Sequence, residues 1–280
     1  MSLGDKEAPN LVNPLKFAER LTEWAWEWKK LDGWQEEVMT SQERYMILNC
    51  SRQSGKSSIL MVKAFHKALT TENALILIIA EQRQSNEDLR KIRELQAAYS
   101  KYLKKTYGGK LVLSLKTDNV TSLEFANGSR IIALPANEKV RGFSAPTMVI
   151  LDEAARLRDE VFVAVDPMLE VSNGQLILAS TPEGTSGFFH REWDNPRYQK
   201  AKFEVPWQFC PRIKQESIEE KRILYGEAFI AQEYECRFLD ELTALFTETA
   251  LQQSIDAGED VFSEEMANIN KIVHGEVELI

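Results

Sequence analysis

The hydrophobic residues of the chain follow two spacings. Short continuous apolar runs predict buried β-strands at residues 45–49, 74–80, 147–153, 175–180 and 203–207. Elsewhere, apolar residues recur at helical spacing and predict helices at residues 15–30, 34–40, 57–69, 86–107 and 161–171. This alternation of strands and helices is typical of a largely parallel sheet with helices on both faces.

Three further strand-like runs lie between the long helix and the strand at 147–153. They cover residues 111–115, 120–125 and 129–134, and Asn127-Gly128 stands between the last two. This dipeptide is the strongest short-range signal for a β-hairpin. We therefore expect an antiparallel addition to the parallel sheet.

Composition limits the class of protein. The 280 residues, 44% of them hydrophobic, suffice for one large domain, and the net charge of −9 means that a polyanion would have to bind a local basic patch. Three separated cysteines without a C-x-x-C pair argue against disulfides and a cysteine zinc site. The longest apolar run is too short for a bilayer and no signal peptide is visible, so we expect a soluble intracellular protein.

The stretch NCSRQSGKSS, residues 49–58, resembles a phosphate-binding loop between a strand and a helix. Its backbone N–H groups would hold the β-phosphate, Lys56 would reach the β and γ oxygens, and Ser57 would bind Mg²⁺. Cys50 stands where the usual pattern has its first glycine, while Gly55 leaves room for the phosphate. The alternative is a chance GKS sequence at a strand-to-helix turn.

Two acids end the apolar strand MVILDE. Asp152 would hold Mg²⁺ through water, and Glu153 would orient and deprotonate an attacking water. The alternative is that both acids only cap the following helix. The next apolar strand ends in Ser180-Thr181, whose hydroxyls would contact the region of the γ-phosphate, unless they are simply a polar strand end before a proline turn.

Four ordered motifs, WQEEV, CSRQSGKSS, KVRGFSAPTMVILDEAARL and LILASTPEGTSGFF, give the chain a resemblance to the ATPase domain of the large terminase subunit of tailed bacteriophages, over about residues 14–240. The resemblance implies a three-layer α/β P-loop NTPase fold of the additional-strand type, with a small C-terminal helical segment. It also implies that Glu153 is the catalytic acid, that Ser180-Thr181 is a coupling motif and that Gln35 recognises adenine. Without the resemblance, Gln35 reads as an exposed helix residue. The residues expected to bind ATP are Gln35, Ser51, Arg52, Gln53, Ser54, Gly55, Lys56, Ser57 and Ser58.

Two arginines are candidates for the cation that stabilises the transition state. Arg52 lies within the phosphate loop, and Arg141 precedes Gly142 in a segment that reads as a loop. We expect Arg141 to act from a neighbouring subunit as an arginine finger and Arg52 to position or sense the nucleotide. The alternative for Arg141 is a surface salt bridge.

Contact with DNA has a weaker basis in the sequence. Residues 83–116 carry nine basic and three acidic side chains, among them Lys101, Lys104 and Lys105, which suit a sequence-independent phosphate track. Such a run is also common on a solvated helix face. The resemblance implies further partners: double-stranded DNA, a homo-oligomeric ring on the portal and the small terminase subunit, in the host cytoplasm and transiently at the procapsid.

These features predict a Mg²⁺-dependent ATPase that powers DNA translocation. We expect an ATPase domain at residues 1–240 and an acidic tail at 241–280, with no room for the nuclease domain of a complete large terminase. The alternatives are a helicase-like or other DNA-dependent P-loop ATPase, which would need a second domain with its own arginine, and a nucleotide-binding switch that does not hydrolyse ATP.

Overall fold

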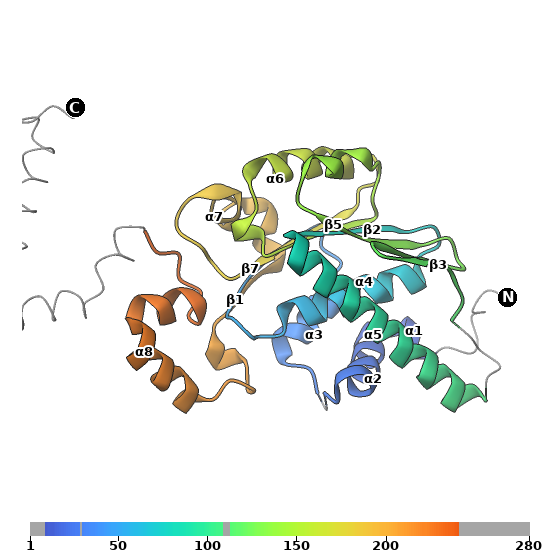
Figure 1. Ribbon diagram of the computed structural model, residues 1–280, viewed down its shortest axis with the longest axis horizontal. Coiled ribbons are helices and arrows are strands. Elements are labelled where there is room, and N and C mark those ends of the chain that lie inside the picture. The colour runs from blue at the N-terminus through green and yellow to red at the C-terminus, as the bar shows by residue number, and fades with distance from the viewer. Residues whose placement is uncertain (1–8, 29, 109–112, 241–280) are drawn as a thin grey trace, which may run out of the picture.

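The computed structural model describes residues 9–28, 30–108 and 113–240. These residues form one eight-stranded sheet in the order β3-β4-β5-β2-β6-β7-β1-β8, with helices on both sides (Figure 1). The strands are β1 Tyr45–Cys50, β2 Leu75–Ala80, β3 Leu115–Asn119, β4 Ser122–Phe125, β5 Arg130–Pro135, β6 Met148–Asp152, β7 Gln175–Ser180 and β8 Lys202–Val205. The α-helices are α1 Pro9–Val12, α2 Pro14–Trp26, α3 Gly33–Thr40, α4 Lys56–Thr70, α5 Gln82–Tyr107, α6 Asp159–Val165, α7 Gly187–Trp193 and α8 Gln215–Glu233.

Every pairing from β5 across to β8 is parallel, and the β3-β4 and β4-β5 pairings are antiparallel. The predicted fold class is confirmed, and the structure shows in addition that β7 lies between β1 and β6. The central strands are buried along almost their whole length because helices cover both of their faces, which explains their continuous apolar runs.

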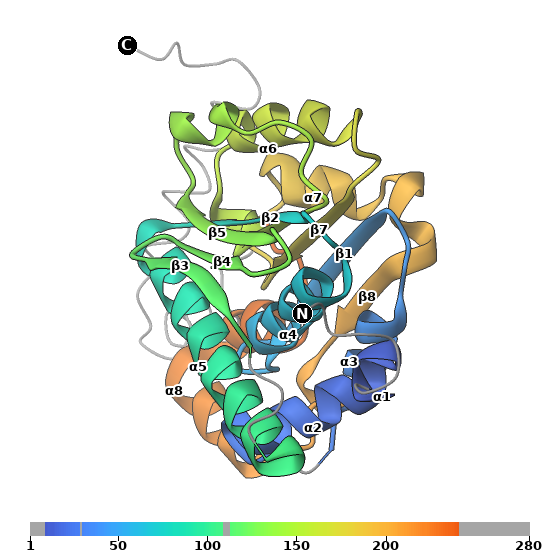
Figure 2. The same cartoon turned by 90° about the vertical axis from the view of Figure 1, so that its right-hand side faces the viewer.

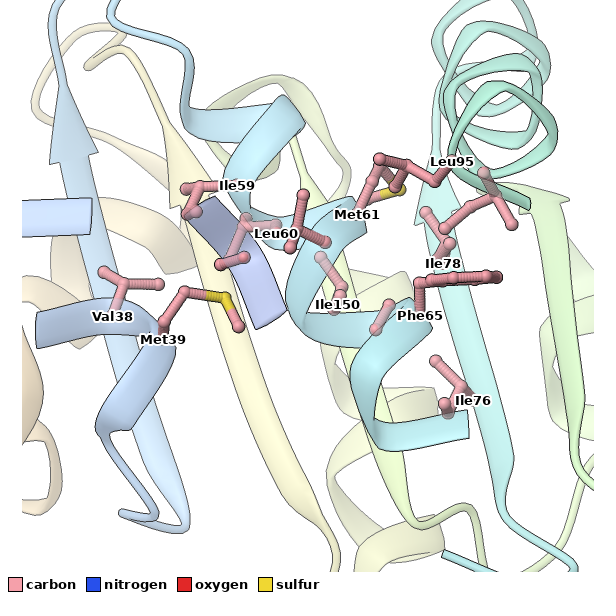
Figure 3. Packing of buried hydrophobic residues seen from close by; sticks show 14 of the residues in the cluster. Val38, Met39, Ile59, Leu60, Met61, Phe65, Ile76, Ile78, Leu95 and Ile150 are labelled. Carbon is pink, nitrogen blue, oxygen red and sulfur yellow. The ribbon is translucent and has the colours of Figure 1, made fainter. Parts of the chain in front are cut away.

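Alternate residues of the strands enter two separate cores. Met46 and Leu48 of β1 face the layer that holds α2, α4 and α5, whereas Ile47 faces the layer with α6 and α7. Figure 2 shows these two layers on opposite sides of the sheet. In the first core α4 is central: Figure 3 shows Met61 and Phe65 beside Ile78. The sheet thereby holds the carboxyl ends of β1, β6 and β7 in fixed neighbouring positions.

The hairpin predicted around Asn127-Gly128 is confirmed as the β4-β5 connection. Gly128 has φ 82°, and the N–H of Phe125 donates to the carbonyl of Ser129 at 2.9 Å. The strand expected before it is placed wrongly, because β3 begins at Leu115 and not at residue 111. Residues 111 and 112 lie outside the described residues. The reason for the error is that β3 is an edge strand, LKTDN, whose mostly exposed polar residues carry no apolar signal.

Three helix predictions also need correction. The helix expected at residues 15–30 is α2, which ends four residues earlier, at Trp26. The helix expected at residues 161–171 is the shorter α6, followed by a 3₁₀ turn, Asp166–Leu169, because Pro167 has no N–H to continue the helical hydrogen bonds. Helix α5 starts four residues before the predicted position 86. Helices α1, α7 and α8 were not predicted from the pattern, and only the resemblance implied a small helical segment toward the C-terminus. None of the helices in the described part of the chain combines the length and apolar character that a membrane span requires.

Candidate functional site

The loop between β1 and α4 has the conformation of an anion-binding turn. Gln53 and Gly55 have φ of 60° and 91°. A Cβ atom on Gly55 would lie 3.1 Å from Nε2 of Gln35 and 3.2 Å from the Trp28 ring, so a larger residue would be both strained and crowded there. The backbone N–H groups of the four residues from Gly55 to Ser58 have no protein acceptor among the described residues. Free N–H groups at a helix start form a ready anion site.

The surroundings of Cys50 explain why this position of the loop does not require the usual glycine. It is the last residue of β1, where it pairs with Val205 of β8, and its side chain is completely buried in the core. The chain is still extended at this position, and the positive φ values come only at Gln53 and Gly55. Burial also raises the pKa of the Cys50 thiol well above its ordinary value. Cys50 therefore acts as a small apolar residue, and position 50 does not need glycine.

A cavity of about 260 Å³ opens over this loop. It is lined by residues 51–58 together with Gln84, Lys91, Glu153, Arg156 and Thr181. The structure thus brings together the whole predicted loop, the predicted catalytic acid and one of the two predicted coupling residues. Gln84, Lys91 and Arg156 were missed by the sequence reasoning.

Lys56 and Glu153 meet directly in the cavity. The Lys56 ammonium lies 2.7 Å from Oε1 of Glu153 and is 8% exposed, whereas Glu153 is 20% exposed. Burial alone would lower the pKa of Lys56, but the carboxylates of Asp152 and Glu153 outweigh burial and raise it. Glu153 has φ 53°, a strained backbone conformation that turns its side chain out of the strand direction. The lysine is therefore charged, and it holds the carboxylate at the loop.

Asp152 lies directly behind Glu153 and is fully buried. Its Oδ1 accepts a hydrogen bond from the N–H of Glu153 at 3.1 Å, and its Oδ2 accepts one from Nε2 of Gln84 at 3.1 Å. Gln84 also donates to Asp88, whose pKa is raised to about 8 by its burial and by the charge of Asp152. Lys91 pairs with Asp88 at 3.2 Å. Helix α5 therefore supplies a polar network behind the acidic strand, which no local motif indicates.

The end of β7 lies between the loop strand and the acidic strand. Ser180 is opposite Asn49 of β1, and Ala179 is opposite Asp152 of β6. Thr181 lines the cavity, while Ser180 is buried and its hydroxyl has no hydrogen-bond partner in the described structure. Both residues therefore lie at the strand tip expected from the sequence, and Thr181 alone of the two lines the cavity.

Gln35 is completely buried, so its interpretation as an exposed helix residue is wrong. Its Oε1 accepts from the N–H of Asp32, and its buried Nε2 has no partner among the described residues. Gln35 lies against Gly55 but does not line the cavity. Nearby, Arg212 donates to both carboxylate oxygens of Asp32 and to the carbonyl of Ser54, and it stacks on the Trp28 ring.

The candidate arginines have different surroundings. Arg52 lines the cavity, is half exposed and pairs with Glu233 at the end of α8 at 3.2 Å. Arg141 lies in the 3₁₀ turn Glu138–Gly142, exposed and outside the cavity lining, and no ion pair of its guanidinium is found within the described residues. Arg156 lines the cavity and faces Glu153. It lies near the end of the motif KVRGFSAPTMVILDEAARL, but the sequence analysis assigned it no role of its own.

The predicted DNA-binding lysines lie far along α5 from the cavity. Lys101, Lys104 and Lys105 occupy its last two turns, and two of them lie over the Trp24 ring, Lys101 at 5.8 Å and Lys105 at 5.2 Å. Two arginines earlier in the segment are paired: Arg90 with Glu87 and Glu94, and Arg93 with Asp118. The excess positive charge of the helix therefore gathers at its C-terminal end.

Comparisons with known proteins agree with this architecture. Residues 47–253 match the profile of a family described as terminase large subunit, T4likevirus-type, N-terminal. The large terminase ATPase domain of Thermus phage P74-26 has a TM-score of 0.63 at 18% identity, covering 75% of this chain and 94% of that one. The bacteriophage HK97 large terminase has a TM-score of 0.58 at 15% identity, covering 79% and 55%.

The large terminase of a thermophilic bacteriophage, in a complex with ADP, has a TM-score of 0.56 at 12% identity. The match covers 75% of this chain and 54% of that one, so the part shared with this chain is about half of that protein, as it is for the HK97 terminase. At such identities the likeness establishes the fold. No curated protein matches the chain.

Proposed function

The chain belongs to the family formed by the N-terminal regions of T4-like terminase large subunits, and from this we propose that it is an ATPase whose hydrolysis of ATP drives double-stranded DNA into a procapsid. The observation that carries the proposal is the 2.7 Å contact of Lys56 with Glu153 over a loop with free N–H groups. A phosphate cradle and a candidate base for water share one cavity, which is the arrangement that nucleotide hydrolysis needs.

Each side chain has a role that follows from its place. The N–H groups of the loop and the ammonium of Lys56 bind the β- and γ-phosphates. Once the phosphates draw Lys56 away, Glu153 is free to orient a water molecule and accept its proton. Thr181 lies where it can contact the γ-phosphate, and Ser180 behind it passes the loss of that phosphate to the following loop. Gln35, with its unpartnered amide nitrogen beside Gly55, recognises adenine.

The oxygen ligands present suit Mg²⁺. Ser57 lines the cavity in the first turn of α4. Asp152 is buried behind the cavity lining and would hold the ion through water, since each of its carboxylate oxygens has one hydrogen bond and keeps a lone pair free. Mg²⁺ typically takes one or two protein oxygens, and its other positions go to phosphates and water. When bound, the ion neutralises charge that develops on the phosphate oxygens.

The motor part of the proposal concerns assembly and DNA. We place the protein in a homo-oligomeric ring at the portal in the host cytoplasm, together with the small terminase subunit. The exposed lysines at the end of α5, Lys101, Lys104 and Lys105, contact DNA phosphates without reading sequence. The proposed ATPase domain covers residues 1–240, and the tail expected at 241–280 lies outside the described residues.

The activity is tested by measuring phosphate release by the purified chain. We expect ATP turnover in Mg²⁺ that falls by about 10²-fold or more when the metal is chelated and returns when Mg²⁺ is added back. Binding of ATP without turnover by the assembled protein in Mg²⁺ would instead favour the nucleotide switch. Addition of a forked duplex distinguishes the remaining alternative, because a helicase-like enzyme separates its strands and a packaging ATPase leaves them paired.

Arg141 is proposed to act across a subunit interface, since its exposed position outside the cavity leaves it free to enter a neighbour's site. Subunits with Arg141→Ala and subunits with Glu153→Gln should each be inactive in the assembled ring. When they are mixed in equal amounts, about a quarter of the sites in a cyclic assembly combine an intact Glu153 with an intact neighbouring Arg141. We expect hydrolysis to recover to about that share. No recovery, where light scattering proves assembly, would contradict the proposal.

A further inference from the structure

One guanidinium in the cavity faces three carboxylates from three parts of the chain. Arg156 ends the 3₁₀ turn Ala154–Arg156 that follows β6. Its Nε donates to Glu183 at 2.9 Å, its Nη1 lies 3.7 Å from Oε2 of Glu153, and its Nη2 lies 3.7 Å from Oε1 of Glu233. The hydrogen bond to Glu183 anchors the side chain, and the fork of the guanidinium then points at Glu153 and Glu233.

The carboxylate of Glu153 is held unevenly by two cations. Lys56 contacts Oε1 at 2.7 Å, whereas Oε2 is buried, has no hydrogen-bond partner in the described structure, and has only Nη1 of Arg156 at ion-pair distance. The same lysine is required at the phosphates when ATP binds. When ATP binds, Glu153 therefore loses its contact with Lys56 just before it has to orient the attacking water. Arg156 is the cation that remains beside Glu153 in the same subunit.

Local geometry favours Arg156 for this task. It follows Glu153 by three residues, and its N–H donates to the carbonyl of Glu153 at 3.0 Å, which holds the two residues close together. A movement of about 1 Å would bring Nη1 from 3.7 Å to the distance of a charge-assisted hydrogen bond. Arg52 is less suited, because the described contact of its guanidinium is with Glu233.

We propose that Arg156 is the positioning residue of Glu153: when Lys56 turns to the phosphates, the guanidinium closes on Oε2 and holds the carboxylate toward the attacking water. This rests on the proposed function, because it assumes that Glu153 activates the water. Arg156 acts through Glu153 and makes no contact with the nucleotide.

The test is the split between turnover and binding. Arg156→Ala should lower kcat for ATP by about 10–100-fold, part of what a general base contributes, and leave the Kd values of ATP and ADP unchanged within about threefold. Arg158→Ala is the matched control, since it removes the same charge from the next turn of the chain at an exposed position outside the cavity lining. Its kcat should equal that of the unchanged protein.

Rescue separates positioning from a structural role. Added guanidinium should restore part of the kcat of Arg156→Ala, and Arg156→Lys should retain part of it, because one ammonium reaches Glu153 but cannot also hold Glu183. The melting temperature should change little, since Arg156 is one-third exposed and its ion pairs are partly screened.

Three results would overturn the inference. One is an unchanged kcat in Arg156→Ala, and another is a fall in kcat that follows a large loss of melting temperature and resists guanidinium. The third is a selective loss of ATP over ADP affinity, which would mean direct contact with the γ-phosphate. Glu153→Gln distinguishes this inference from the proposed function: if that variant is inactive while Arg156→Ala is fully active, only the role of Arg156 fails.

Discussion

Glu153→Gln is expected to lower ATP turnover by about 10³-fold, within the range that a general base contributes, while ATP still binds. The amide has the shape of the carboxylate, so the side chain still fits between Lys56 and Arg156. The amide of glutamine cannot accept the proton of water. The substitution also removes one negative charge from beside the triphosphate. Single-turnover phosphate release and the Kd of a fluorescent ATP analogue measure the two effects separately, and we expect the Kd to stay equal or fall.

Glu160→Gln provides the control for that variant. Glu160 is an exposed acid in the first turn of α6, outside the cavity lining, and its replacement makes the same change of charge. Turnover by this control should match that of the unchanged protein. If Glu153→Gln hydrolysed ATP at the original rate, the assignment of Glu153 as the group that activates water would be wrong.

Lys56→Ala is expected to weaken ATP binding by about 10–100-fold, the value of a charge-assisted hydrogen bond to phosphate. Turnover should fall further, by about 10³-fold, because the lysine also stabilises charge on the transferring phosphoryl group. The loss also leaves Oε1 of Glu153 without its 2.7 Å partner, so a carboxylate is left facing the phosphates without its lysine. Isothermal titration with ATP and a phosphate-release assay measure the two effects.

Lys67→Ala is the control on the same helix, because Lys67 lies in the last turn of α4 and does not line the cavity. Its ATP affinity should be unchanged. Melting temperatures of both variants show whether the mostly buried Lys56 also supports the fold. An ATP affinity of Lys56→Ala within twofold of the original would exclude the loop as the phosphate site.

The parts of the fold that could be predicted are those whose signal lies in a short stretch of consecutive residues. Helix α4 and strands β1, β2, β6 and β7 were placed within two residues because their apolar residues lie close together in the sequence and are mostly buried. The edge strand β3 was misplaced because its outward-facing polar residues resemble a loop. Helix α6 was made too long because apolar spacing continues past Pro167, where the α-helical hydrogen bonds stop.

The candidate site divides in the same way. The loop residues and Glu153 were found because each lies at the end of a short apolar strand, and parallel strands end at one edge of a sheet. The sequence analysis missed Gln84, Arg156 and Glu233. Their roles depend on residues that lie beside them only in the folded protein, and no local sequence pattern indicates those contacts. For Gln35, the interpretation from its helix position alone was wrong, because the structure buries it beside Gly55. Its contact with adenine, which the resemblance implies, stays a prediction.

The amino-acid sequence alone therefore predicted most of the elements, the loop between β1 and α4 and the pair of acids at the end of β6, since each depends on a short run of neighbouring residues. The tertiary structure established which charges meet: Lys56 with Glu153 across 97 residues, and Arg52 with Glu233 across 181. The physical reason is that strand order sets these distances. Inserting β7 between β1 and β6 decides which side chains share the cavity, and no local periodicity carries that order.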